Sequence, residues 1–331
     1  MKTGEKSDAI AIREHLKALQ KASWLSPAQR WWPNYLFHFT DVQSAANILR
    51  SNELLSRIRA LSSGQMVVNG ASPEILQRTD ERHKDFVRLY FRPRIPTQYR
   101  NEGFRPKAER LLGGAHCPVP VYLLFDSASL LCRFGTLFAD GNFAAGATPQ
   151  SSAKSFEQIP FELVYHDSRF EASERDKIVY HRHAEVLVPQ RLDLDTLRFV
   201  WCRSQAEYET LLYLLPPMAR SRWLQRIGVS DSNLFFKHWS FVESVVLNSA
   251  QVRFNFNAST KTPGPFDIRV ELTQVADGSK YLWEHDRYLA NDSLILDNSN
   301  LSNATDYSIR LFLEGDLAFA GRYQEEIELP F

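Results

Sequence analysis

The sequence predicts a mixed α+β domain followed by a small all-β domain. Helical and strand patterns alternate irregularly up to about residue 230, which is typical of an α+β domain. Short β-type runs broken by Gly, Pro, Asn, Asp and Ser then continue, at intervals typical of a β-sandwich. We therefore expect an N-terminal helical extension over 1–34, an α+β domain over 35–232 and a β-sandwich accessory domain over 233–331.

Apolar and alternating runs predict five strands in the α+β domain, at 35–39, 86–91, 119–125, 178–188 and 197–202. Helical spacing predicts helices over 42–51, from Ser72 toward His83, and over 205–215. Thr40-Asp41 supplies an N-cap for the first of these, and Asn52 a stop. An earlier helix, which Ser7 can cap, places Ile12, Leu16 and Leu19 on one face.

Six further strands are expected in the C-terminal part, separated by turn residues. They cover residues 251–257, 266–273, 280–284, 293–296, 307–313 and 322–329. Alternation is clearest from Tyr307 to Phe312, where apolar and polar side chains take turns.

The composition indicates a protein of the cytoplasm. No apolar run reaches the roughly 18 to 20 residues that a membrane helix needs, and the N-terminus has no signal-peptide core. The cysteines at 117, 132 and 202 are few and far apart, so we expect neither a disulfide framework nor a Cys-x-x-Cys metal clip.

A net charge of zero hides an asymmetry between the two parts of the chain. From Lys237 onward there are 8 Lys/Arg and 14 Asp/Glu, a balance of −6, so the preceding part carries +6. A basic front part can bind a polyanion, although a local patch matters more than a sum.

Glu185 is the first candidate functional residue. It stands in the apolar run Ala184-Glu185-Val186-Leu187-Val188, where an unpaired carboxylate is costly and should have a partner or a task. Strand alternation would place His181, His183, Glu185 and Leu187 on one face. His181-x-His183 has no third ligand at diagnostic spacing, so we expect no metal.

A basic, aromatic tract begins in the strand at 86–91. Alternation places Val87, Leu89 and Phe91 on one face, and Arg88, Tyr90 and Arg92 on the other. Four more cations follow, interleaved with Tyr99 and Phe104: Arg100, Arg105, Lys107 and Arg110. Cations among aromatic rings suit single-stranded nucleic acid, although a solvated basic loop explains the charge equally well.

Two short motifs complete the candidate set. His38 and Thr40 are one residue apart on an extended segment, so they point the same way and could bind ribose hydroxyls or an amide; a structural histidine beside a capping threonine is the alternative. Asp140-Gly141 is a turn signal, and an ordinary surface turn is its simplest interpretation.

Taken in order, these motifs resemble the DarT family of bacterial toxins, which transfer ADP-ribose from NAD⁺ to bases in single-stranded DNA. The resemblance covers residues 35–203. It rests on four elements: His38-x-Thr40; Phe86-Val87 through Tyr90-Phe91-x-Pro93-Arg94-x-Pro96; Phe138-x-Asp140-Gly141 followed by Ala144; and Arg182-x-Ala184-Glu185-x-Leu187-Val188. Three positions depart from the family pattern: Ile95 and Thr97 replace the serine and methionine of its Ser-Pro-Met, and Asn142 replaces a histidine. The identity of the base, and DNA versus RNA, therefore stay open.

The resemblance implies a site for NAD⁺ as co-substrate, without a metal. Glu185 would be the catalytic carboxylate, and the catalytic arginine would be Arg78 or Arg82. His38 and Thr40 would hold the NAD⁺ ribose and amide, Tyr90 or Phe91 would line the nicotinamide slot, and Leu54 and Arg94 would complete the NAD⁺ contacts. The expected nucleic-acid contacts are Arg88, Arg92, Arg100, Arg105, Asp140 and Asn142.

The resemblance also implies a biological role. The protein would be the toxin of a toxin–antitoxin or phage-defence system, with single-stranded DNA or RNA as its substrate. Its antitoxin would be a macrodomain hydrolase or a sequestering protein, bound through the C-terminal β domain. An ADP-ribosyltransferase that modifies a protein, and a non-catalytic nucleic-acid-binding module, are the alternatives.

Overall fold

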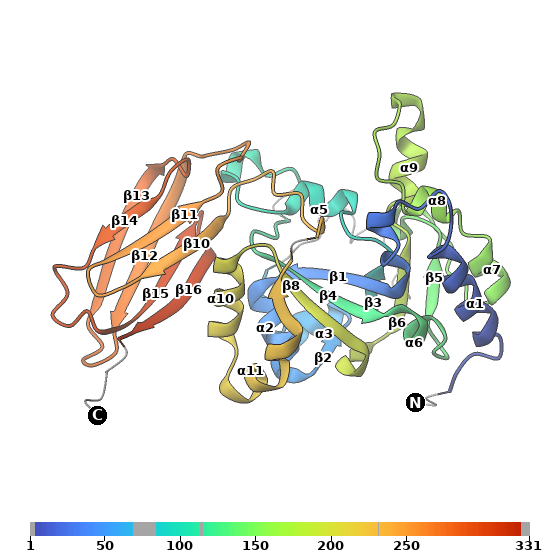
Figure 1. Ribbon diagram of the computed structural model, residues 1–331, viewed down its shortest axis with the longest axis horizontal. Coiled ribbons are helices and arrows are strands. Elements are labelled where there is room, and N and C mark those ends of the chain that lie inside the picture. The colour runs from blue at the N-terminus through green and yellow to red at the C-terminus, as the bar shows by residue number, and fades with distance from the viewer. Residues whose placement is uncertain (1–3, 69–83, 113–114, 231, 326–331) are drawn as a thin grey trace. The chain divides into compact units, whose positions relative to one another are not determined.

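A computed structural model describes residues 4–68, 84–112, 115–230 and 232–325 (Figure 1). The chain divides into two compact units, each continuous in space but not in sequence. The first unit comprises 1–40, 47–99 and 122–200, and the second comprises 41–46, 100–121 and 201–331. Within the part of the chain that the structure describes, no helix is both long and apolar enough to cross a membrane.

The first unit is built on a mixed β-sheet. Its strands are β1 (Tyr35–Asp41), β3 (Phe86–Tyr90), β4 (Pro120–Asp126), β5 (Leu137–Ala139), β6 (Glu185–Pro189) and β8 (Leu197–Cys202). They follow one another across the sheet in the order β5-β6-β3-β1-β4-β8. β3 pairs antiparallel with both β1 and β6. A separate pair joins β2 (Glu53–Leu55) and β7 (Arg191–Asp193).

Short helices connect these strands. They are α1 (Ala9–Leu19), α2 (Val42–Ser51), α3 (Arg57–Ser62), α5 (Pro96–Asn101), α6 (Ser127–Leu131), α7 (Ala153–Glu157), α8 (Phe161–Val164) and α9 (Arg175–His181). Turns of 3-10 helix lie at Pro27–Gln29, Trp32–Asn34, Phe143–Ala145, Ala172–Glu174 and Leu194–Thr196. Some ends carry clear stop signals: Asn52 ends α2 in the left-handed region, with φ 60°.

The second unit contains the C-terminal β region and two helices, α10 (Gln205–Leu214) and α11 (Pro217–Trp223). Its remaining strands are β9 (Ile227–Val229), β10 (Val242–Leu247), β11 (Gln251–Phe256), β12 (Phe266–Gln274), β13 (Lys280–Tyr288), β14 (Leu294–Asp297), β15 (Asp306–Leu313) and β16 (Asp316–Gln324). The strands β10 to β16 form two sheets, β10-β11-β14 and β13-β12-β15-β16. Phe254 of the first sheet contacts Phe319 of the second, with ring centroids 5.8 Å apart.

Most predicted elements are confirmed. The α+β class, the strand at 197–202 and the buried face Ile12, Leu16 and Leu19 all agree with the structure. Asp8, rather than Ser7, directly precedes α1. The helix expected from Ser72 lies outside the described residues.

The strand predicted over 178–188 is wrong for its first half. Residues Arg175–His181 form helix α9, a turn follows, and β6 begins only at Glu185. The run Ile178-Val179-Tyr180 has high β-propensity, but Ile178 is buried and its carbonyl accepts the amide of Arg182 in a helical hydrogen bond. Tertiary packing therefore overrides local preference here.

The last strand also lies elsewhere than predicted. It covers 316–324, because Glu314 and Gly315 adopt φ 54° and 82° and reverse the chain directly after β15. Leu313 pairs with Asp316 across this two-residue hairpin turn. Residues 326–329 of the strand predicted over 322–329 lie outside the described residues.

Candidate active site

Glu185 begins β6 and is almost completely buried, with 3% of its surface exposed. Register places it directly opposite Tyr90 of β3 on one side and Ala139 of β5 on the other. Directly opposed residues in a ladder project to the same face of the sheet, so Tyr90 and Ala139 flank the carboxylate. The prediction that this carboxylate is embedded in apolar surroundings is confirmed.

Arg88 is the charge partner of Glu185. Its guanidinium NH1 lies 3.3 Å from Oε2 of Glu185 and 5.7 Å from the centroid of the Phe143 ring. Burial raises the pKa of Glu185 to about 7, and the charge of Arg88 opposes this rise without cancelling it. A carboxyl group with such a pKa can hold or release a proton near neutrality, which is the property that acid–base catalysis requires.

His38 of β1 has a defined tautomer. Its Nδ1 lies 3.0 Å from the carbonyl oxygen of Arg88, which can only accept, so Nδ1 carries the proton. Burial lowers the pKa of His38, and the ring is therefore neutral at pH 7. Nε2 is then an acceptor for a hydroxyl or amide hydrogen. Thr40, two residues along the strand, is half-buried.

Tyr90 and Phe91, the two alternatives for the nicotinamide slot, have different environments. Tyr90 lies opposite Glu185 and contacts Phe39, and burial raises the pKa of its hydroxyl, which stays protonated. Phe91 is 1% exposed and packs against Phe156 and Phe161 in the core. Of these two residues, Tyr90 is the one placed to line a slot beside Glu185.

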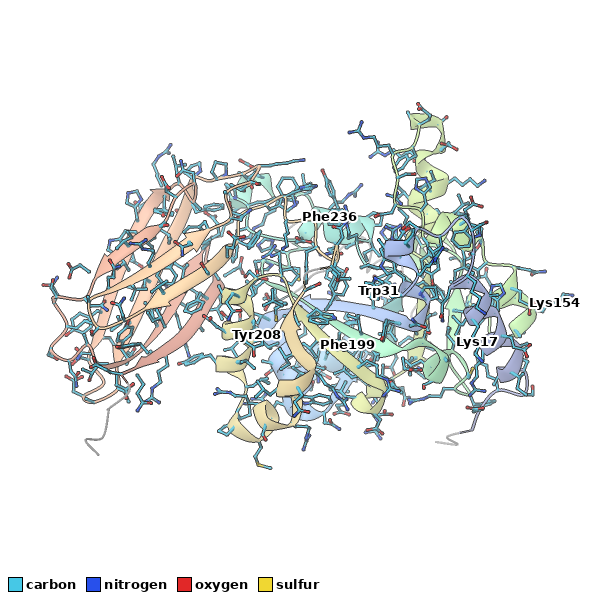
Figure 2. All side chains as sticks on the ribbon, viewed as in Figure 1. Lys17, Trp31, Lys154, Phe199, Tyr208 and Phe236 are labelled. Atoms are coloured by element: carbon cyan, nitrogen blue, oxygen red, sulfur yellow. The ribbon has the colours of Figure 1, made fainter. Side chains whose placement is uncertain are left out.

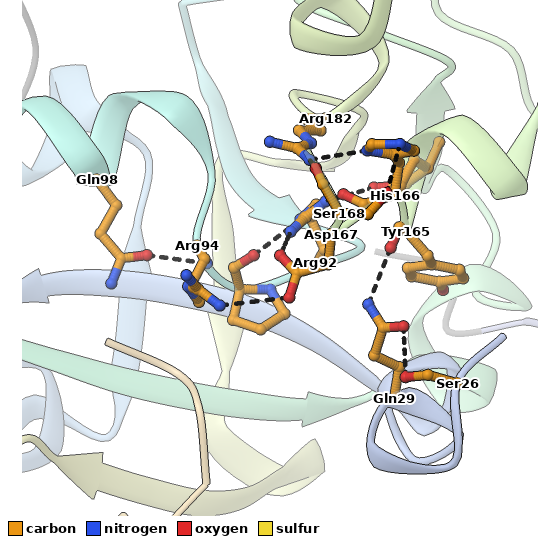
Figure 3. A network of polar contacts seen from close by, with 12 residues as sticks. Ser26, Gln29, Arg92, Arg94, Gln98, Tyr165, His166, Asp167, Ser168 and Arg182 are labelled. Atoms are coloured by element: carbon orange, nitrogen blue, oxygen red, sulfur yellow. Dashed lines mark hydrogen bonds and ion pairs between the residues drawn. The ribbon is translucent and has the colours of Figure 1, made fainter. Parts of the chain in front are cut away.

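Arg92 was expected on the nucleic-acid face, but the structure buries it at 1% exposure (Figure 3). Its guanidinium donates to the carbonyl oxygens of Pro93, Val164 and His166, and to Oδ1 of Asp167 at 2.8 Å. The expectation is wrong for a physical reason: the guanidinium is buried, and four hydrogen bonds already join it to protein acceptors.

Arg94 completes the same network. Its NH1 lies 3.3 Å from Oδ2 of Asp167, and its amide donates to Oε1 of Gln98 at 2.9 Å. Close by, Arg182 donates to Nδ1 of His166, as Figure 3 shows. These bonds tie the segment after β3 to the segment around 166–168, so the network supports the geometry of the loop that follows Tyr90.

The remaining expected nucleic-acid contacts differ among themselves. Arg105 is buried in the second unit, with its guanidinium 3.6 Å from the ring centroid of Trp239, so the expectation of a phosphate contact is wrong for it. Arg100 is exposed. Arg88 is a quarter exposed, but its guanidinium forms an ion pair with Glu185.

Asp140 and Asn142 flank a turn that is tightly held. The carbonyl oxygen of Asp140 accepts a hydrogen bond from Nδ1 of His181 at 2.7 Å, and its Oδ1 accepts one from the Tyr180 hydroxyl at 3.4 Å. A Cβ at Gly141 would lie 2.1 Å from the Tyr180 ring, so only glycine allows this approach. His181 and His183 therefore do not share the Glu185 strand face: His181 holds this turn, and His183 accepts from the Thr97 hydroxyl through Nε2 at 3.1 Å.

Arg57 was missed by the sequence reasoning. It opens α3 directly after β2 and is partly buried, and its pKa is lowered by burial and by the charge of Arg88. It therefore adds a second cation near Arg88.

Arg78 and Arg82, the two candidates for the catalytic arginine, lie outside the described residues. Leu54 is buried in β2 opposite Leu192.

The described residues contain no group of three or more His, Cys, Asp or Glu side chains that could hold a metal ion. The arrangement instead offers a buried carboxylate with a cation, a neutral imidazole acceptor and an aromatic wall. That set suits a reaction in which positive charge develops on a bound ribose.

Comparison with known proteins supports the same class. The family model described as "ssDNA thymidine ADP-ribosyltransferase, DarT" matches residues 37–236. The protein is thus an NAD-dependent ADP-ribosyltransferase acting on single-stranded nucleic acid. It belongs to the DarT family.

Solved structures with a similar fold have low sequence identity to this chain. DarT of Thermus sp. 2.9 in complex with ADP-ribosylated ssDNA is 18% identical, with TM-score 0.47 over 62% of this chain and 97% of that one. The same protein in complex with NAD⁺ is 17% identical, with TM-score 0.45 over 62% of this chain and 98% of that one. Thermosipho africanus DarTG in complex with ADP-ribose is 17% identical, with TM-score 0.46 over 65% of this chain and 53% of that one. A search of curated proteins finds no match.

Proposed function

We propose that this protein transfers ADP-ribose from NAD⁺ to a thymidine base of single-stranded DNA, with Glu185 as its catalytic carboxylate. The observation that supports this most directly is the position of Glu185, which is buried beside Tyr90 and ion-paired to Arg88. The family description supports the acceptor, because it specifies thymidine in ssDNA.

The chemistry follows from the charge that develops. The bond between the ribose carbon and nicotinamide breaks, nicotinamide leaves with the electron pair, and the ribose becomes oxocarbenium-like. The Glu185 carboxylate stabilises this positive charge in a low-dielectric site. A nitrogen of the base then bonds to the same carbon, and its proton passes to the carboxylate.

We assign the surrounding residues to the donor. His38 accepts a ribose hydroxyl or carboxamide hydrogen at Nε2, and Thr40 contributes its hydroxyl on the same strand. Tyr90 forms the wall of the nicotinamide slot. Arg57 is the candidate partner for the pyrophosphate, because it is a partly buried cation whose pKa responds to the charge of Arg88.

Incubation with NAD⁺ and separate ssDNA and RNA oligonucleotides tests the proposal. The expected result is a mass increase of one ADP-ribose on a thymidine-containing DNA strand and none on a strand without thymidine. Modification of RNA alone would overturn the acceptor assignment. Modification of proteins in an added lysate, with unmodified oligonucleotides, would overturn the class of substrate.

We further propose that the chain is a toxin restrained by an antitoxin, that it works in the cytoplasm and that it can serve in phage defence. The β region over 233–331 would be the accessory domain that binds the antitoxin. Its balance of 8 cations to 14 carboxylates from Lys237 onward makes it a poor surface for DNA and a suitable one for a basic protein partner. Copurification of a neighbouring gene product with the wild-type chain, lost when acidic side chains of this region are reversed, would support this role.

A further inference from the structure

The first unit contains a second candidate binding site, an open pocket of about 450 Å³. Four segments far apart in the sequence line it: α1 with the residue after it, the start of β1, the end of β4 with the start of α6, and the start of β8. Its polar and charged lining consists of Arg13, Lys17, Gln20, Asn34, Tyr35, Asp126, Ser127 and Arg198. α1 precedes the residues that the family model matches, so this pocket uses a part of the chain that the catalytic site does not explain.

Cations outnumber carboxylates in the pocket. Arg13, Lys17 and Arg198 line it, against a single carboxylate, Asp126, which also caps α6 by accepting the amide of Ser129 at 2.8 Å. Arg198 lies 3.4 Å from Asp126 and is about half exposed. Outside the pocket, Glu5 pairs with Arg13. Three cations against these two carboxylates, Asp126 and Glu5, leave an excess of one positive charge, which favours an anionic ligand.

Aromatic rings stand beside these cations. Phe199 is 36% exposed on β8 and lies edge-to-face with Tyr35, with ring centroids 5.7 Å apart. Tyr35 also contacts Trp31, 5.9 Å away. Figure 2 labels Lys17, Trp31 and Phe199. An exposed ring among cations is the combination that binds a nucleotide, because the ring stacks on the base and the cations contact the phosphate.

The pocket lies several strands away from Glu185 in the same sheet. Trp31 contacts Phe37 of β1, Phe37 pairs with Tyr90, and Tyr90 pairs with Glu185. β1 is two strands from β6, about 10 Å, and β8 is two strands further, about 19 Å from β6 in all. A ligand that reaches both places is longer than one nucleotide.

We propose that this pocket binds one nucleotide of the single-stranded substrate, away from the base that is modified. Its phosphate contacts Lys17, Arg13 and Arg198, and its base stacks on Phe199 beside Tyr35. This assignment rests on the proposed function for the identity of the ligand. It gives the N-terminal helix a role in holding the strand while Glu185 acts on another base.

Binding of a labelled oligothymidylate of about 16 nucleotides, measured by fluorescence anisotropy without NAD⁺, tests this directly. Phe199→Ala should weaken binding at least about fivefold, the lower end of the loss of one stacked base. Phe199→Trp should retain the affinity, because it keeps an aromatic face. Lys17→Ala should reduce the slope of log affinity against log salt by about 0.7, the value of one phosphate contact.

Matched controls come from the same unit. Phe134→Ala removes a ring that is 66% exposed, and Lys154→Ala removes an exposed cation of α7, and neither residue lines the pocket. Both controls should bind as the wild type does. Equal affinity of Phe199→Ala, Lys17→Ala and the controls would overturn the proposal. So would weakened binding of AMP by Phe199→Ala with unchanged binding of the long strand, because the pocket would then hold a free nucleotide.

A transfer assay on the same oligonucleotide separates this proposal from the proposed function. Loss of strand affinity in Phe199→Ala, combined with no transfer by the wild type, would leave the pocket in place and overturn the function. Transfer by the wild type, combined with undiminished strand affinity in both pocket variants, would support the proposed function and overturn the proposed nucleotide pocket.

Discussion

Arg88 reaches diagonally across the β3–β6 ladder to Glu185, with 3.3 Å between NH1 and Oε2. Arg88 itself is opposite Leu187, and Glu185 is opposite Tyr90, so the pair joins residues two positions apart in register. Long side chains span such diagonals readily. The carboxylate thus stays buried next to a cation that is itself a quarter exposed, and this cation offsets only part of the cost of burying the charged form.

Glu185→Gln should abolish transfer while keeping the fold. The amide matches the carboxylate in shape but can neither stabilise the developing positive charge nor accept the proton. A loss of about 10²- to 10⁴-fold in kcat is expected from the acid–base contribution. The measurement is the rate of ADP-ribose transfer, with Tm as the control for folding. A variant with normal activity would show that another group is the base.

The rate should depend on pH through Glu185. Burial raises the pKa of this carboxyl to about 7, and the charged form is the active one, so kcat/KM for NAD⁺ should rise as pH rises through about 7. Arg88 opposes the rise, so Arg88→Ala should move the profile to higher pH, whereas Arg88→Lys, which keeps the charge, should move it less. An unchanged profile in Arg88→Ala would mean that the ion pair does not control ionisation.

Stability should also depend on pH, through Asp41 in the second unit. Burial raises its pKa to about 7. Between the ordinary carboxyl value and about 7 this carboxyl holds a proton in the folded chain that it releases in the unfolded chain, so its contribution to the free energy of unfolding should fall as pH rises, by at most about 1.4 kcal/mol per pH unit. Glu185 and Glu207, whose pKa burial also raises to about 7, add to the same trend. Denaturant titrations at pH 6 and pH 8 measure this. Asp41→Asn should reduce the pH dependence, while the exposed control Asp286→Asn should leave it unchanged.

Local patterns predicted the elements whose signal lies within a few residues. The alternation of 86–91 gave β3, and the carboxylate among apolar neighbours singled out Glu185. Local patterns failed to predict the surroundings of a side chain where a segment distant in the sequence covers it. Arg92 alternates with Arg88 and Tyr90, but the segment around Asp167 returns to cover its guanidinium, and no spacing within the strand encodes that return.

The position of charged groups near the carboxylate was also beyond local reasoning. Arg57 stands in a different element from Arg88 and becomes its neighbour only through the fold. His181 and His183 were placed on the Glu185 face because a strand was extended through a helix, and their observed contacts belong to Asp140 and Thr97 instead. In both cases the sequence shows the residue type, but tertiary packing sets its partner.

Arg92 and Arg100, both expected to bind DNA, should respond differently to substitution. Arg92→Ala removes a buried guanidinium and leaves Oδ1 of Asp167 and three carbonyl oxygens without their donor, so a loss of about 3–5 kcal/mol in the free energy of unfolding is expected. Arg92→Lys should recover only part of it, because one ammonium group cannot reach all four acceptors. Denaturant unfolding measures both variants. Arg100→Ala should unfold as the wild type does, since its side chain is exposed. A stable Arg92→Ala protein that binds oligonucleotides poorly would restore Arg92 to the nucleic-acid surface.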